Sequence, residues 1–154
     1  MTEANGRKIT SILFACTMNS VRSPIAEGVA KAMFGRRIHL DSAGLRRAER
    51  DGFALSVLRE IGVDFSDDEA STLDQIGLEG FDLIVTLSRE AREHVAERIR
   101  ATSIEHVHWQ IDDPTLTQGN REERLAAYRS VRDRIRSLLK AEIAPRMRNM
   151  THIT

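Results

Sequence analysis

The sequence predicts a three-layer α/β sandwich, in which helices flank a four-stranded parallel sheet. Short apolar runs alternate along the chain with longer segments whose apolar residues recur every three or four positions. No linker, repeat or low-complexity stretch interrupts this alternation, and 154 residues suit one hydrophobic core. We therefore expect a single domain over residues 1–154, with its core at about residues 9–142.

The first half of the chain supplies two strands and two helices. Residues 9–15 are mostly apolar and predict a buried strand, and residues 24–34 predict a helix with apolar positions at four-residue spacing. Residues 38–42 predict a short strand that ends at Ala43-Gly44. Residues 51–61 then predict a second helix with one apolar face.

The second half repeats the alternation. Residues 81–87 predict a strand, residues 88–100 a helix, and residues 104–109 a strand of alternating pattern. After a loop at residues 110–119, the last helix begins at Asn120, which has a capping-box glutamate three positions later. Ligands bind at the carboxyl ends of strands in such sheets, so the loops after the first and fourth strands should open on the same edge.

Composition excludes several classes of protein. The chain has 23 basic and 23 acidic residues, and its single cysteine cannot form an intrachain disulfide. No stretch reaches the ~20 apolar residues of a membrane span, so we expect a cytoplasmic protein without a membrane partner. Basic residues of the last helix have acidic neighbours, so a solvated face is expected there and not a nucleic-acid partner: Arg129, Arg132, Arg134, Arg136 and Lys140.

The most informative motif lies directly after the first predicted strand. Residues 16–23 are Cys-Thr-Met-Asn-Ser-Val-Arg-Ser, and the next residues open a helix. Backbone N–H groups and a helix N-terminus can hold an anion there, and these surroundings lower a thiol's pKa. The arginine fork of Arg22 can bind two phosphate oxygens, so the motif predicts Cys16 as a nucleophile in phosphoryl transfer. The alternative is that Cys16 is a buried structural thiol.

The other residues of the motif are expected to support Cys16 and to shape the loop. Ser23 can cap the helix and also donate to the Cys16 thiolate, and both roles are compatible. Asn19 tolerates left-handed backbone and forms local hydrogen bonds, so it is expected to shape the loop. The remaining loop positions are Thr17, Met18, Ser20 and Val21.

Phosphoryl transfer to a thiol needs a proton donor for the leaving oxygen. Asp113, followed by Pro114, lies in the loop after the fourth predicted strand, on the expected edge of the sheet. Asp112 is its rival, because one of the two carboxylates can serve only to shape the turn. We favour Asp113 as the general acid.

Several motifs together resemble the low-molecular-weight protein-tyrosine-phosphatase family and the related thioredoxin-coupled arsenate reductases. The resemblance covers about residues 9–140 and rests on residues 16–23, 23–27, 42–44, 81–85 and 113–114. It implies a phosphotyrosine phosphatase I-like fold. It also implies roles for six residues: Cys16 as nucleophile, Arg22 as phosphate clamp, Ser23 as thiolate partner, Asn19 as loop holder, Ser42 as its support, and Asp113 as acid.

The chain departs from the family pattern at informative positions. Met18 stands where the family usually has glycine, and Val21 stands where the phosphatases have a second cysteine. Thr17 and Ser20 look like the reductase branch, but Ser88 stands where that branch has its first relay cysteine. An internal cysteine relay is therefore impossible in this chain. The Asp113 loop also lacks the aromatic residue that many tyrosine phosphatases place after Asp-Pro.

The sequence thus favours a cysteine-dependent phosphatase that acts on phosphotyrosine or other phosphate monoesters, including phosphotyrosyl proteins. Two alternatives stay open: an arsenate reductase recycled by an external thiol or glutaredoxin, and a phosphate-binding regulatory module with little turnover. Phosphate and arsenate are the expected oxyanions, and no metal or organic cofactor is expected. His106 and His108 face one side of a strand, but they have no further ligands at metal-binding spacing.

Overall fold

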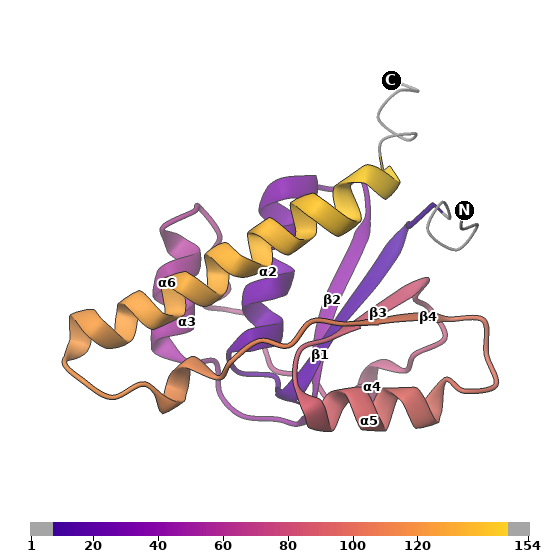
Figure 1. Ribbon diagram of the computed structural model, residues 1–154, viewed down its shortest axis with the longest axis horizontal. Coiled ribbons are helices and arrows are strands. Elements are labelled where there is room, and N and C mark those ends of the chain that lie inside the picture. The colour runs from indigo at the N-terminus through magenta and orange to yellow at the C-terminus, as the bar shows by residue number, and fades with distance from the viewer. Residues whose placement is uncertain (1–7, 148–154) are drawn as a thin grey trace.

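The computed structural model describes residues 8–147 and contains one four-stranded parallel sheet. Its strands are β1 (Ser11–Met18), β2 (His39–Arg46), β3 (Leu83–Thr86) and β4 (Glu105–His108), in the spatial order β2-β1-β3-β4 (Figure 1). All three strand pairings are parallel, with β1 in the centre next to β2 and β3. The predicted fold class is therefore confirmed.

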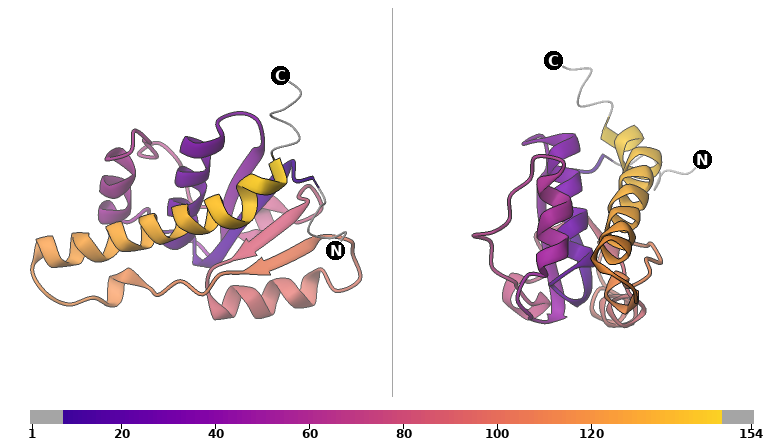
Figure 2. Two further views of the ribbon diagram at one scale, coloured as in Figure 1. Left: turned by 45° about the horizontal axis from the view of Figure 1, so that its top comes forward. Right: turned by 90° about the vertical axis from the view of Figure 1, so that its left-hand side faces the viewer.

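Helices cover both faces of this sheet. One face carries α2 (Arg22–Phe34), α3 (Gly52–Arg59) and α6 (Arg121–Leu138), and the other carries α4 (Leu73–Ile76) and α5 (Arg89–Arg98) (Figure 1). Figure 2 shows α6, in orange to yellow, running alongside α2. A short π-helical turn and a 3-10 turn prolong α6 to Met147. No helix among residues 8–147 is both long and apolar enough to cross a membrane.

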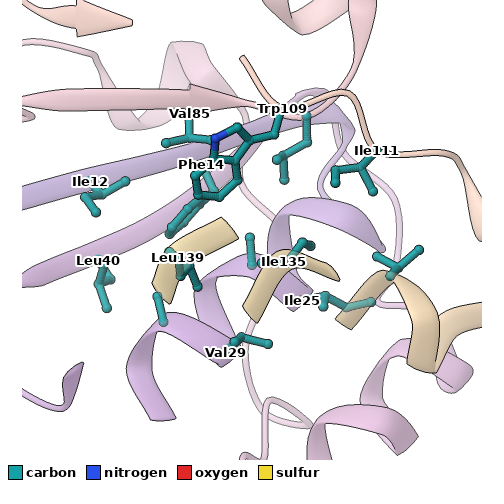
Figure 3. Close-up of a cluster of buried hydrophobic side chains, with 14 of the residues drawn as sticks. Ile12, Phe14, Ile25, Val29, Leu40, Val85, Trp109, Ile111, Ile135 and Leu139 are labelled. Carbon is teal, nitrogen blue, oxygen red and sulfur yellow. The ribbon is translucent and has the colours of Figure 1, made fainter. Parts of the chain in front are cut away.

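The alternation of side chains along β1 divides the core into two layers. Ile12 and Phe14 pack with α2 and α6, whereas Leu13 and Ala15 pack with α4 and α5. Figure 3 shows the larger layer, where Phe14 and Trp109 lie with residues from the helices. Because β1 pairs with β2 on one side and with β3 on the other, its carboxyl end places Cys16 between two neighbouring strands at the edge of the sheet.

The strands next to the motif run farther than the sequence indicates. The β1–β2 ladder continues through the pairs Cys16–Gly44 and Met18–Arg46, so the expected break at Ala43-Gly44 is wrong. A Cβ atom on Gly44 would lie 2.4 Å from the Asn19 nitrogen, so this glycine permits close approach and does not end the strand.

One helix differs from the prediction and one capping box agrees with it. Helix α4 was not predicted, although Thr72 and Gln75 form a capping box at its start. Asn120 and Glu123 form the capping box predicted for α6.

The basic face of α6 is partly neutralised by α3. Arg129 and Arg132 lie 2.8 Å and 2.7 Å from carboxylate oxygens of Glu60. Arg134, Arg136 and Lys140 are exposed. The predicted solvated face is therefore confirmed for Arg134, Arg136 and Lys140, whereas it is wrong for Arg132, whose side chain is 13% exposed and donates to the Val57 carbonyl.

These ion pairs predict a pH-dependent stability. Hydrogen bonds from Arg129 and Arg132 lower the pKa of Glu60 from 4.5 to about 2. The folded state therefore binds fewer protons than the unfolded state in this window, and stability present above pH 4.5 is lost as the pH falls toward 2. The Glu60→Gln variant should lose less stability than the wild type as the pH falls, measured as the free energy of unfolding in urea at several pH values.

A second surface carboxylate serves as the control for this experiment. Glu97 forms an ion pair with Arg100, and both side chains are well exposed. Glu97→Gln should keep the acid slope of the wild type, and high salt should reduce the difference between Glu60→Gln and the wild type. If the unfolding free energy falls equally steeply with pH in the wild type and in Glu60→Gln, the ion pairs of Glu60 are not the source of the acid sensitivity.

Candidate active site

The motif at residues 16–23 lies where β1 passes into α2, as predicted. Cys16 is buried, with 1% of its surface exposed, and its Sγ lies 2.9 Å from Ser23 Oγ. The Sγ also lies 2.8 Å from the carbonyl oxygen of Met18. The thiol therefore has one hydroxyl neighbour from α2 and one carbonyl neighbour from its own loop.

These neighbours determine the protonation of Cys16. Burial raises the pKa of the Cys16 thiol, while hydrogen bonds from the Ser23 side chain and N–H, and the charge of Arg22, act in the opposite direction. Burial is the largest of these effects, so the expected lowering of the thiol pKa is wrong for this conformation. A protonated Sγ donates to the Met18 carbonyl here, whereas a thiolate would be repelled by it.

Asn19 connects the loop to the sheet. Its Nδ2 donates to Ser23 Oγ at 2.8 Å and to Ser42 Oγ at 3.1 Å. Among residues 8–147 only glycines have positive φ, so Asn19 shapes the loop by hydrogen bonds and not by left-handed backbone. The structure thus brings Asn19, Ser23 and Ser42 together.

Sequence reasoning missed a buried carboxylate behind this cluster. Glu27 is 3% exposed, accepts a 2.6 Å hydrogen bond from Ser42 Oγ, and lies 2.6 Å from Lys31 Nζ. Burial raises the pKa of Glu27, against the hydrogen bonds and charge of Lys31 and the bond from Ser42. The spacing of Glu27 and Lys31 was a signal of a pair, but such pairs usually lie on exposed helix faces.

A second charged residue outside the motif contacts the loop. Arg50 Nη1 donates to the carbonyl oxygen of Asn19 and to its Oδ1, and Arg50 Nη2 pairs with Asp68. Nothing in the local sequence pattern marks Arg50, because it lies 31 positions from Asn19.

Arg22 links the cysteine loop to the loop after β4. Its Nη1 donates to the carbonyl oxygen of Ile111 at 3.0 Å. Asp112 and Asp113 follow directly, so the two loops meet at one edge of the sheet, as predicted.

The two aspartates differ in their surroundings. Asp112 is exposed, whereas Asp113 is half-buried and caps the 3-10 turn Pro114–Leu116. The Asp113 Oδ1 accepts from the N–H of Thr115 at 3.0 Å and from its Oγ1 at 2.8 Å. Asp113 therefore also shapes its own turn, a role that the sequence argument assigned to one aspartate of the pair.

A tyrosine of α6 is linked to the cysteine loop through an aspartate. The Tyr128 hydroxyl donates to Asp51 Oδ2 at 3.0 Å, and the N–H of Asp51 donates to the Ser20 carbonyl at 3.2 Å. Burial, the Asp51 hydrogen bond and the charges of Asp51 and Asp113 raise the pKa of Tyr128. Asp51 and Tyr128 thus connect α6 with the cysteine loop, and Tyr128 also feels the charge of Asp113.

The remaining loop positions have distinct surroundings. Thr17 Oγ1 donates to Ser88 Oγ at 2.9 Å, and Ser88 accepts from the N–H of Ala91 as the N-cap of α5. The residue at the relay-cysteine position therefore lies beside the loop as a capping hydroxyl. Met18 is 40% exposed and Val21 is buried.

The two histidines of β4 both contact a threonine of the neighbouring strand β3. His106 Nε2 and His108 Nδ1 lie 2.9 Å and 2.8 Å from Thr86 Oγ1. Burial lowers the pKa of His106. Across residues 8–147, no group of three or more possible metal-ligating side chains occurs.

Comparison with known proteins shows the family of this chain. A family model described as low molecular weight phosphotyrosine protein phosphatase matches residues 11–148. A curated arsenate reductase of Halalkalibacterium halodurans is 40% identical over 131 residues, which cover 84% of this chain and 91% of that protein.

Solved structures share the fold. A structure described as an arsenate reductase in the phosphate binding state has a TM-score of 0.73 at 25% identity, covering 89% of this chain and 98% of its own. The tyrosine phosphatase amsI of Erwinia amylovora has a TM-score of 0.74 at 23% identity, covering 91% and 95%. With a family match over nearly the whole described chain, the protein belongs to the low molecular weight phosphotyrosine protein phosphatase family.

Proposed function

We propose that this protein is a cysteine-dependent phosphatase that hydrolyses phosphotyrosine or other phosphate monoesters. One observation carries the proposal: Cys16 Sγ lies 2.9 Å from Ser23 Oγ, and the neighbouring Arg22 reaches the backbone of the Asp113 loop. Nucleophile, cation and acid loop therefore meet at one edge of the sheet. A buried structural thiol would need none of these partners.

Each residue has a defined part in the reaction. Substrate phosphate displaces the Met18 carbonyl from Cys16, and Arg22 binds two of the phosphate oxygens. The Cys16 thiol, which donates to the Met18 carbonyl in this conformation, loses its proton to solvent as the phosphate binds. The resulting thiolate attacks phosphorus in line, an S–P bond forms, and the P–O bond of the ester breaks. Asp113 gives its proton to the leaving oxygen.

The second half of the reaction returns the enzyme to its starting state. Asp113, now a carboxylate, takes a proton from water as the water oxygen attacks phosphorus. The S–P bond breaks, inorganic phosphate leaves, and Ser23 donates a hydrogen bond to the departing thiolate. The lone reduced thiol fits a cytoplasmic location.

A second candidate follows from the 40% identical arsenate reductase. Here Cys16 attacks arsenate and water leaves. A thiol from outside then attacks the Cys16 sulfur, which gives a mixed disulfide and arsenite, and a second thiol releases Cys16. The outside thiol is a small thiol or a glutaredoxin-type protein, because this chain has one cysteine.

One panel of assays tests both candidates: an aryl phosphate, a phosphotyrosyl peptide, and arsenate with each thiol system. We expect turnover of the esters, with arsenate as a competitive inhibitor because it mimics phosphate. Thioredoxin with its reductase and NADPH should not sustain arsenate turnover, because no internal disulfide can form.

The outcomes separate three functions. Sustained thioredoxin-linked NADPH oxidation, with no other thiol present, would refute the phosphatase proposal. Turnover of arsenate only with glutaredoxin or a small thiol would support the second candidate. Phosphate binding without turnover in any assay would indicate a regulatory binding module.

A further inference from the structure

We propose that Arg50 is a positioning residue for the oxyanion loop, acting through Asn19 and Ser23 on the Cys16 thiolate. The inference rests on the proposed function only in that the loop binds a phosphate-like anion. Arg50 lies just before α3, outside every motif that marks the site in the sequence.

Arg50 contacts Asn19 at two atoms, the backbone carbonyl oxygen and the side-chain oxygen Oδ1. Its Nη1 lies 2.5 Å from the Asn19 carbonyl oxygen and 2.7 Å from Asn19 Oδ1. The N–H of Ser71 donates to the same Oδ1 at 2.9 Å. Because Oδ1 receives two donors, the orientation of the amide is unambiguous and Nδ2 must point toward Ser23 and Ser42.

This orientation determines which way each hydroxyl points. Asn19 Nδ2 can only donate, so Ser23 Oγ accepts from it and has one proton left to donate. Two acceptors lie within reach of that proton, Cys16 Sγ at 2.9 Å and the Ala43 carbonyl oxygen at 3.4 Å, and a Cys16 thiolate is the closer and the charged one. Ser42 likewise accepts from Asn19 and donates to Glu27. Arg50 therefore favours the arrangement in which Ser23 stabilises a thiolate.

Burial of the Arg50 side chain costs free energy of folding. Its side chain is 7% exposed, whereas its partner Asp68 is 44% exposed. Arg50 Nε is the buried side-chain nitrogen or oxygen without a hydrogen-bond partner among residues 8–147. A surface pair would avoid this penalty, so the benefit of the placement lies at Asn19.

The test compares Arg50→Met, Arg50→Lys and Asp68→Asn with the full-length wild type. Two readouts need no substrate: the pH midpoint of Cys16 alkylation by iodoacetamide, and the dissociation constant for inorganic phosphate. Arg50→Met should raise the midpoint by about half a pH unit and weaken phosphate binding about tenfold, as expected for losing a charged hydrogen bond.

The other variants should change the alkylation midpoint and the phosphate affinity by less than Arg50→Met does. Arg50→Lys keeps the charge and one donor, so it should recover part of the phosphate affinity. Asp68→Asn should also raise the alkylation midpoint and weaken phosphate binding, but by less than Arg50→Met. Arg98→Met removes a surface pair with Asp74 and should leave both readouts at the wild-type values.

Two outcomes overturn the proposal. One is an Arg50→Met variant that melts at a lower temperature but keeps the wild-type alkylation midpoint and phosphate affinity. The other is an Arg50→Lys variant that recovers nothing. If the wild type hydrolyses no phosphate ester, the proposed function fails, while alkylation and phosphate titration still decide the role of Arg50.

Discussion

Replacing Cys16 with serine should abolish phosphate-ester hydrolysis and leave the fold intact. The thiol supplies the only thiolate that this chain can form. A serine hydroxyl at the same place would need a base to activate it, and the Cys16 Sγ contacts a hydroxyl and a carbonyl. Steady-state assays with an aryl phosphate measure the loss, and circular dichroism checks the fold.

The Cys16→Ser change is nearly isosteric and can keep the two polar contacts of the buried side chain. Ser23 Oγ and the Met18 carbonyl can both bond a hydroxyl at position 16, so the buried pocket stays satisfied. Ser88→Ala is the control, because it removes a capping hydroxyl near the loop without touching the thiol. Retained turnover in Cys16→Ser would rule out the covalent mechanism, whatever the control shows.

The sequence was sufficient for the fold because its signals are local. Apolar runs gave the four strands, and helical periodicity with capping residues gave α2, α3, α5 and α6. The continuation of β1 and β2 past Cys16 and Gly44 could not be predicted, because it depends on pairing between the two strands. Helix α4 has four residues, too few for a periodic pattern.

The site was predictable only where residues lie in one motif or at one edge. Cys16, Arg22 and Ser23 come from one eight-residue motif, and Asp113 from the expected topology of a parallel sheet. Glu27 and Arg50 act through Asn19 and Ser42, which are distant in sequence, and no local pattern distinguishes them from surface charges. The raised pKa of the thiol depends on burial, which motif composition does not determine.

Removal of the proposed general acid, Asp113, should have the second largest effect on turnover. Asp113→Asn should lower turnover by roughly 10²–10⁴, the usual contribution of a positioned proton donor. Asparagine can still accept the Thr115 hydrogen bonds that cap the turn, so the loop should keep its shape. The loss should shrink for substrates with good leaving groups, because their leaving oxygen needs less protonation.

Asp112→Asn is the matched control, since it removes the same charge from the adjacent, exposed position. It should cost much less turnover and keep the wild-type dependence on the leaving group. If Asp112→Asn shows the large loss and Asp113→Asn the small one, the acid is Asp112, and the contacts of Asp113 with Thr115 are then its whole role. The loop would remain the source of the proton, because Arg22 still ties Ile111 to the cysteine loop. A leaving-group dependence that neither variant changes would place the acid outside residues 112 and 113.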